Sequence, residues 1–198
     1  EELQKFRDGS DPYGYPNTDW NKEVLLPRAW QQMHSLTASG GSDKVKYFAG
    51  FGYVKQDALY GDTRTNKSTS GFNRYNARVN IDANIVDKYL NLSADMAYRQ
   101  EDRNSIAGST SDVFNNMHRN PQTDPGRFPD GNLGKVSLGV NPIGLATEGG
   151  WVKDRKSVLN TRFMLDFNVP GLEGLNLKGI FSYDKIFNSI KRWTTPVD

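Results

Sequence analysis

Residues 72–85 alternate between apolar and polar side chains without a break. Successive side chains of a β-strand point to opposite faces, so this run predicts a strand with one apolar and one polar face. The mostly apolar face collects Asn73, Tyr75, Ala77, Val79, Ile81, Ala83 and Ile85. The polar face collects Phe72, Arg74, Asn76, Arg78, Asn80, Asp82 and Asn84. Strands of soluble sheets are usually about five or six residues long, whereas about 9–11 tilted residues cross a bilayer, so this strand is long enough to span a membrane.

The same two-residue period recurs along the chain and predicts six strands. They are expected near residues 31–40, 44–55, 72–86, 90–101, 156–169 and 175–188, after a leading loop segment at 1–30. The connections alternate between short turns and two long loops, at 56–71 and 102–155. Short turns at one end and long loops at the other are typical of outer-membrane barrels, whose long loops face the outside.

We therefore predict an all-β fold, an antiparallel transmembrane β-barrel of which this chain supplies about six strands within one domain, residues 1–198. The two long loops are expected to be extracellular. A soluble β-sandwich also alternates apolar and polar positions, so a soluble all-β module that binds carbohydrate remains an alternative. In a sandwich, a second sheet would cover Tyr75, Val79 and Ile81, and Arg78 and Asp82 would face bulk solvent.

The composition excludes several classes of protein. Hydrophobic residues make up 36% of the chain and the mean hydropathy is −0.70, and no segment reaches the ~18–20 consecutive apolar residues of a spanning helix. A barrel tolerates these values because only every second residue meets lipid. There is no cysteine, which excludes a disulfide framework and a thiolate metal site. The 25 basic residues are interleaved with 23 acidic ones, which argues against a nucleic-acid partner.

The sequence contains no arrangement of residues typical of an active site. His34 and His118 are far apart, and neither has a Ser, Cys or Asp in a recognised nucleophile motif. A loose group of oxygen ligands is formed by Asp8, Asp11, Asn17 and Asp19. Their spacing fits no EF-hand, and polar turn chemistry explains them equally well. We predict a protein that is not an enzyme, with no catalytic residue, no cofactor and no metal site.

Six strands are too few to close a membrane barrel. An open sheet in lipid leaves two rows of unpaired backbone groups, each costing several kcal/mol, and the smallest closed barrels have about 8 strands. We expect the other strands to come from the same polypeptide or from further copies of the chain. The first residues also lack the apolar core of a signal peptide, so the beginning of an exported protein is expected to lie upstream.

Several motifs occur in an order that is informative. They are Arg7–Pro12, Tyr15–Trp20, Ser39–Lys44, Tyr47-Phe48, 72–82 and Asn141-Pro142. Together they resemble the early barrel region of SusC-like TonB-dependent transporters, and the likeness covers most of the chain. The resemblance implies a nutrient importer in the outer membrane of a diderm bacterium, with a barrel of about 22 strands and a plug domain inside it. The plug and the segment that engages TonB would lie upstream of Glu1, and the other strands downstream of Asp198.

The same resemblance implies the partners. These are a SusD-like surface lipoprotein that forms a lid over the barrel, the TonB energy-coupling complex, the lipid of the outer membrane, and a glycan or peptide substrate. Substrate would be captured between lid and barrel, and a pull on the plug would open a path through the lumen. A passive outer-membrane porin is a further alternative.

Two sets of side chains are candidates for the transport function. The residues expected to face the lumen and the plug are Arg74, Asn76, Arg78, Asn80, Asp82, Asn84, Asp95, Arg99, Arg162 and Asp166. The residues expected in or next to loops, where they would bind substrate or the lid, are Phe114, Arg127, Phe128, Trp151 and Trp193. Aromatic rings there would stack on sugars or hold a peptide, although loop packing and an interfacial aromatic belt are equally ordinary roles. Prolines in the loop 102–155 indicate an ordered surface.

Overall fold

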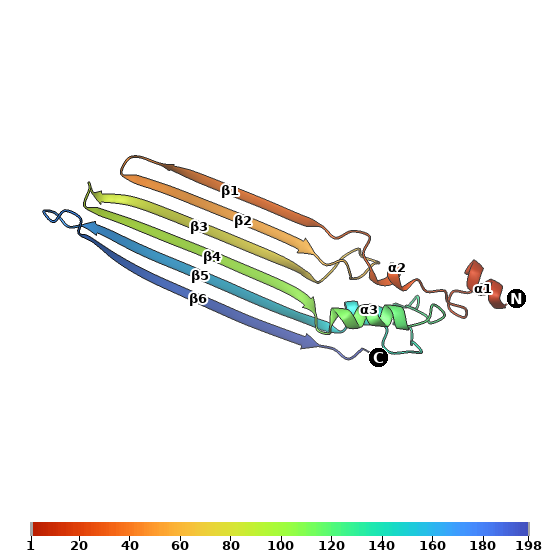
Figure 1. The fold of residues 1–198 in the computed structure, drawn as a ribbon. Coiled ribbons are helices and arrows are strands. Elements are labelled where there is room, and N and C mark those ends of the chain that lie inside the picture. Colours follow the sequence, from red (N-terminus) through yellow and green to blue (C-terminus); the bar gives the residue numbers. More distant parts are fainter. Residues whose placement is uncertain (1, 198) are drawn as a thin grey trace.

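The computed structural model describes residues 2–197, and the fold is all-β. A single antiparallel sheet contains six strands in the order β1-β2-β3-β4-β5-β6, so each strand pairs with its neighbours in sequence (Figure 1). The strands are β1 (Gln31–Gly41), β2 (Val45–Asp57), β3 (Gly71–Val86), β4 (Leu90–Ile106), β5 (Gly150–Asn168) and β6 (Asn176–Thr194). Both β4 and β5 extend into the segment 102–155, which the sequence pattern had predicted to be loop.

The register places most apolar positions of the strands on one face of the sheet, although Ile180, Ile186 and Ile190 of β6 lie on the other. Val79 of β3 lies opposite Ala49 of β2 and Met96 of β4, and Phe163 of β5 lies between Ala94 and Phe181. We call this side the apolar face and the other side the polar face. A slip of one residue between two strands would move every side chain of a strand to the other side, so the apolar pattern itself fixes this register.

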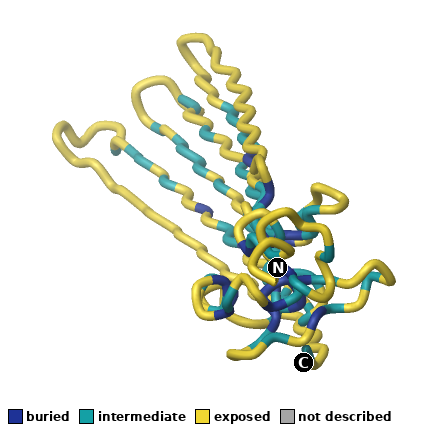
Figure 2. Tube along the Cα trace, turned by 90° about the vertical axis from the view of Figure 1, so that its right-hand side faces the viewer, coloured by how far each residue is buried: buried dark blue, intermediate teal, exposed yellow. Residues whose placement is uncertain are grey.

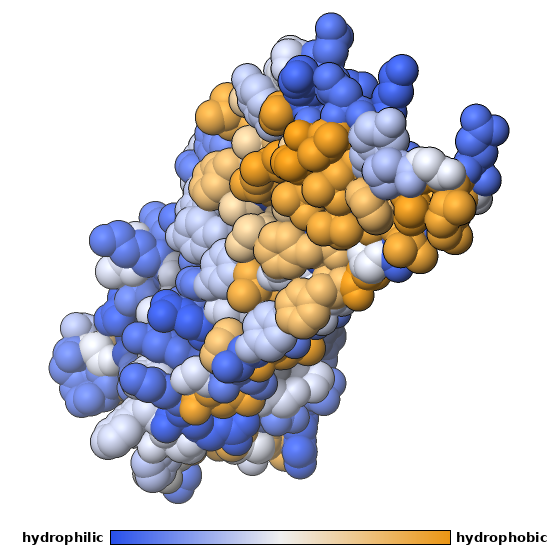
Figure 3. All heavy atoms as spheres, turned by 90° about the vertical axis from the view of Figure 1, so that its left-hand side faces the viewer, coloured by the Kyte–Doolittle hydropathy of each residue, from blue (hydrophilic) through white to orange (hydrophobic). Residues whose placement is uncertain are grey.

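Within residues 2–197, no second sheet covers the apolar face. Tyr75 is 37% exposed, and Val79 and Ile81 are each 41% exposed, although all three lie in the middle of the sheet. Figure 3 shows the apolar side chains gathered in one continuous patch with hydrophilic side chains around it. A soluble sandwich would bury this patch against a second sheet, so the described residues do not form that fold.

The long connections fold into a compact cap at the end of the sheet opposite the short turns (Figure 1). Four helices lie at this end: α1 (Glu2–Asp8), α2 (Trp20–Val24), α3 (Thr110–Arg119) and α4 (Pro142–Thr147). The core of the cap is formed by Trp20, Val24, Ile106, Val113, Met117, Ile143 and Ala146. Figure 2 shows that the buried stretches of the chain are concentrated here. The segments 1–30 and 102–155 therefore contain helices and strand ends, not only loop as predicted.

Within residues 2–197, no helix is long and apolar enough to cross a membrane.

The end of the apolar alternation explains why the ends of β4 and β5 were missed. Beyond Tyr98, the positions of β4 on the apolar face are Gln100, Asp102 and Asn104, so both faces become polar while the strand continues. Hydrogen-bonded pairing with β5 persists through Ile106, which lies opposite Trp151. Periodicity detects a strand only while its two faces meet different surroundings.

Candidate functional site

The ten residues predicted to face the lumen all lie on the polar face. We call them the polar ladder: Arg74, Asn76, Arg78, Asn80, Asp82 and Asn84 of β3, Asp95 and Arg99 of β4, and Arg162 and Asp166 of β5. The register brings three of them into one row, because Asn80 lies opposite Asp95 and Asp95 lies opposite Arg162. Whether this side faces an aqueous bore remains a prediction.

Hydrogen bonds join the middle of the ladder. Arg78 Nε donates to Asn80 Oδ1 over 2.9 Å, and the amide of Asn80 donates to Asp95 Oδ1. On the neighbouring strands, Asn160 Nδ2 donates to Asp184 Oδ1 over 2.7 Å. These bonds run along and across the strands, so the polar side chains hold one another in place on the face of the sheet.

A shallow groove of about 220 Å³ opens on the polar face where β3, β4, β5 and β6 meet. Its charged and amide side chains are Arg78, Asp95, Asn160, Arg162 and Asp184. Two guanidinium groups and two carboxylates balance in charge, and every group donates or accepts hydrogen bonds. Such a lining suits a partner that carries amides and both signs of charge, as a polypeptide does.

Some ladder residues have charged partners and others have buried atoms without one. Arg99 Nε lies 3.5 Å from Glu101 Oε1, and Lys178 Nζ lies 3.5 Å from Asp166 Oδ2. In contrast, Arg74 Nε and Asn84 Oδ1 are buried with no hydrogen-bond partner among residues 2–197. A buried polar atom left unpaired costs about 1–3 kcal/mol, so both positions contribute unfavourably to the stability of the sheet in this arrangement.

Two of the five residues predicted to contact substrate or the lid pack into the cap, and their role as ligand contacts stays a prediction. The side chain of Arg127 is only 10% exposed, and its Nη2 lies 2.8 Å from Glu148 Oε1 while its Nη1 donates to the carbonyl of Gly131. Phe114 is half-buried and packs against the cap core. Phe128 is more exposed and lies against Tyr13, with ring centroids 6.4 Å apart.

The two tryptophans lie on strands, not in loops. Trp151 and Trp193 face each other across β5 and β6 on the same side as the apolar face, at the cap end. Both side chains are exposed. The sequence analysis expected them in or next to loops; the structure places them at the strand ends that adjoin the cap, and their contact with substrate or the lid stays a prediction.

The loop between β2 and β3 is also attached to the cap by hydrogen bonds. The carbonyl of Val24 accepts a hydrogen bond from the amide of Gly61, and Thr63 Oγ1 donates to the carbonyl of Glu23. Arg64 Nε lies 3.1 Å from Asp62 Oδ1, and this hydrogen bond from Arg64 lowers the pKa of Asp62 below its usual range. The predicted loop 56–71 is thus an ordered part of the cap.

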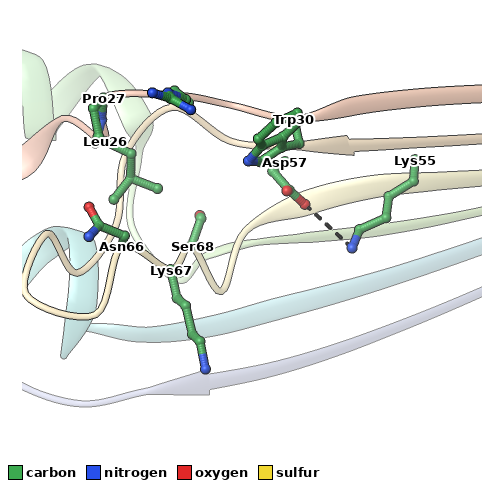
Figure 4. Close-up of a pocket in the computed structure, with 9 residues that line it drawn as sticks. Leu26, Pro27, Trp30, Lys55, Asp57, Asn66, Lys67 and Ser68 are labelled. Atoms are coloured by element: carbon green, nitrogen blue, oxygen red, sulfur yellow. Dashed lines mark ion pairs between the residues drawn. The ribbon is translucent and has the colours of Figure 1, made fainter.

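A cleft of about 520 Å³ lies beside this loop, between the segment that precedes β1 and the end of β2. Figure 4 shows Trp30 with Lys55 and Asp57, whose Nζ and Oδ1 atoms are 3.9 Å apart. Lys55 and Asp57 occupy apolar-face positions of β2, so the cleft is not on the polar side of the sheet. It therefore lies off any path along the polar ladder.

A group of tyrosines bounds the apolar face toward the cap, and the sequence reading missed it as a boundary. Tyr53 and Tyr75 contact each other with ring centroids 5.1 Å apart, and Tyr98 and Tyr183 lie on the same face of β4 and β6. From Ile85 to Tyr75 the apolar stretch of β3 spans about 33 Å, or about 25 Å in height at a strand tilt of about 40°. This equals the apolar band of membrane barrels, which is about 25 Å tall and edged by aromatic residues.

The signal was present in the sequence. On three strands a tyrosine is followed by a polar residue at the next position of the same face: Lys55 after Tyr53 on β2, Gln100 after Tyr98 on β4, and Lys185 after Tyr183 on β6. The positions of this change on neighbouring strands can be compared only when the register between the strands is known, and the register comes from the structure.

Comparison with known proteins supports the fold. No protein-family model matches the sequence, and no curated protein matches it. A structure of the RagAB peptide importer in the 'open-open' state is similar with a TM-score of 0.65 and 17% identity over 90% of this chain and 20% of that chain. A structure of the RagAB peptide transporter is similar with a TM-score of 0.61 and 16% identity over 92% of this chain and 22% of that one. The chain therefore spans about a fifth of the chains that it matches, and it shares the fold of that part of them.

Proposed function

We propose that this chain forms part of the wall of a SusC-like, TonB-dependent nutrient importer in the outer membrane of a diderm bacterium. One observation carries the proposal: an uncovered apolar band about 25 Å tall, edged by tyrosines, lies back to back with a continuous polar ladder. A sheet with these two faces suits a wall between lipid and water.

The two edge strands support a larger barrel. Among residues 2–197, β1 and β6 each pair on one side only, and every residue of both strands is exposed. Each unpaired backbone group in hydrocarbon costs several kcal/mol, so further strands are needed on both edges. A barrel of about 22 strands, as in other outer-membrane transporters, satisfies both edges and leaves a lumen that holds a plug.

The polar ladder is proposed to line the lumen and contact the plug. Arg74 and Asn84 lie on the same face of β3, where their accessible donors and acceptors would hydrogen-bond a plug domain. Arg78 and Asp82, which share this face, would add ion pairs that hold the plug in register.

Peptide is favoured over glycan as the substrate. The groove between Arg78, Asp95, Arg162 and Asp184 offers both signs of charge beside an amide, which suits peptide backbone and termini. The two similar structures are of a peptide importer. They are transporters, and no catalytic role is proposed for any residue of this chain.

The uptake experiment uses the complete protein in its own cells. Cells that express it should take up a fluorescent oligopeptide, and a deletion strain should lose most of this uptake. Collapse of the proton-motive force with a protonophore should abolish uptake, because transport through a plugged barrel needs energy. Uptake that persists with the protonophore would support a passive porin, and uptake of a labelled oligosaccharide in place of the peptide would overturn the peptide assignment.

The cap is proposed as the docking surface for a SusD-like lipoprotein lid. It is the ordered, exposed end of the chain, and the strand ends beneath it are close, since the amide of Ala107 donates to the carbonyl of Gly150 over 3.2 Å. A short Gly/Ser turn can therefore replace residues 108–149 without changing β4 or β5.

This replacement should greatly reduce co-purification of the lipoprotein while the barrel remains folded. The measurement is the ratio of lipoprotein to barrel after affinity purification from detergent extracts. A matched control changes the opposite end, replacing the turn 171–174 with another tight turn, and should retain the partner. An unchanged ratio in the cap variant would argue against this docking surface.

A further inference from the structure

A strip of basic side chains, the basic strip, extends from the tyrosine boundary toward the cap on the apolar face of β5 and β6. Lys185 follows Tyr183 along β6, and Arg155, Lys153 and Lys191 lie closer to the cap. All four side chains are exposed. These positions share the face that meets lipid in the proposed function, on which this inference rests, but they lie beyond the apolar band.

The charges of this basic strip are incompletely compensated. Arg155 Nε lies 2.6 Å from Asp102 Oδ1, so that guanidinium is paired. Within residues 2–197, no carboxylate lies within ion-pair distance of Lys153, Lys185 or Lys191. Lys153 and Lys191 even lie directly opposite each other on neighbouring strands, and like charges in that arrangement destabilise a sheet. An anion between them would convert the repulsion into attraction.

The surface around the two lysines is hollowed and polar. A groove of about 410 Å³ is lined by Asn73, Asp102, Asn104, Lys153, Asp154, Arg155, Ser189 and Lys191. Lysine ammonium groups bind phosphate as point charges, and the amide and hydroxyl groups can hydrogen-bond its oxygens and neighbouring sugar hydroxyls.

Aromatic rings alternate with these cations along the strip. Lys185 Nζ lies 4.8 Å from the ring centroid of Phe187, and Lys153 Nζ lies 4.7 Å from that of Trp151. Trp151 and Trp193 end the strip beside the cap. An exposed tryptophan face packs well on the flat apolar side of a sugar ring.

The height of the strip distinguishes between kinds of lipid. From Lys185 to Lys191 is about 20 Å along the strand, or about 15 Å in height at a tilt of about 40°. The headgroup layer of a simple bilayer is only about 5–8 Å deep on each side. A phospholipid headgroup would reach Lys185 but not the Lys153 and Lys191 pair, whereas a headgroup of several phosphorylated sugars reaches both.

We propose that the basic strip binds the phosphorylated oligosaccharide headgroup of a glycolipid in the outer leaflet, with phosphate between Lys153 and Lys191. The bound glycolipid neutralises the facing lysines and fixes the height of the barrel in the membrane. The site is separate from the polar ladder, because it lies on the opposite face of the same strands.

The test uses the complete barrel, purified free of lipid in detergent and titrated by native mass spectrometry. The three probes are a phosphorylated lipopolysaccharide with a short sugar core, the same glycolipid after phosphatase treatment, and phosphatidylglycerol. The double variant Lys153→Gln/Lys191→Gln should bind the phosphorylated glycolipid at least about tenfold more weakly than the unmodified protein. Phosphatase treatment should weaken binding to the unmodified protein by a similar factor.

The matched control is Lys156→Gln/Arg192→Gln, which removes two positive charges from the polar face of the same two strands. It should bind the glycolipid within about twofold of the unmodified protein, given that each surface charge contributes only near its own lipid contact. Equal binding by the Lys153/Lys191 variant and the unmodified protein would overturn the proposal. Phosphatidylglycerol binding that is equally tight, and is lost in that variant, would also overturn it by making the strip a general phosphate site.

A heat-dependent shift in electrophoretic mobility, measured on the same samples, reports whether the barrel is folded. It distinguishes failure of the lipid site from failure of the proposed function. A barrel that shows this shift and inserts into vesicles but binds no glycolipid refutes only the lipid site. A protein that does not insert at all refutes the proposed function first.

Discussion

Replacing Val79 with arginine should destabilise the membrane-inserted protein by about 2–4 kcal/mol, which is the cost of a cationic side chain on the lipid face near the middle of a bilayer. Val79 lies opposite Ala49 and Met96, between Tyr75 at the cap end of the band and Ile85 at the turn end. The change introduces a charge without filling a packed interior, because the side chain is already 41% exposed. The measurement is the free energy of unfolding by urea in phospholipid vesicles.

Ser93→Arg is the matched control for this prediction. Ser93 lies on the polar face of β4, opposite Asp82, so an arginine there meets a carboxylate and should change the free energy of unfolding by less than about 1 kcal/mol. If both variants cost the same small amount, Val79 faces water and the membrane assignment of the apolar face is wrong.

Replacing Asn141 with alanine should unfold the cap while leaving the sheet intact. Asn141 is fully buried, and its Nδ2 donates to the carbonyls of Gly126 and Gly134 over 2.8 and 2.9 Å while its Oδ1 accepts from the amide of Ile143 over 3.0 Å. Alanine leaves the Gly134 carbonyl and the Ile143 amide buried and unpaired, while the Gly126 carbonyl still accepts from the amide of Gly134, so the total cost is about 3 kcal/mol. Hydrogen exchange in residues 108–149 should therefore accelerate by roughly a hundredfold.

Asn115→Ala tests whether the effect belongs to this side chain. Asn115 is an exposed residue of α3, and its replacement should leave the exchange rates of the cap within about twofold. Exchange that accelerates equally in β3 and β4 of the Asn141 variant would contradict the idea that cap and sheet unfold as separate units.

The sequence was most informative where a strand has different surroundings on its two sides. Tyr75, Val79 and Ile81 alternate with Arg78 and Asp82, and the structure places these two sets on opposite faces of one antiparallel sheet. The all-β fold was predictable for this reason. The pairing of β1 with β2, of β3 with β4 and of β5 with β6 followed as well, because a tight turn leaves two neighbouring strands little choice of partner.

The cap was less predictable because its stability comes from contacts between distant segments. Trp20 packs with Val113 and Ile143, which lie roughly a hundred residues further along the chain, and helices as short as α2 and α4 carry little periodic signal. Arg127 illustrates the same limit. It looked like a ligand-binding cation in sequence, but its partner Glu148 is brought to it only by the folded loop.

The side-by-side order of the strands also bears on how such a protein changes its size over evolution. Each strand of this sheet bonds only to the one before and the one after it, through hairpins closed by tight turns on one side. Duplication or loss of one hairpin would therefore leave every other ladder undisturbed. Since the diameter of a barrel grows roughly linearly with its strand number, the bore would widen or narrow in steps of two strands, and a family built this way can fit its cargo without redesigning its wall.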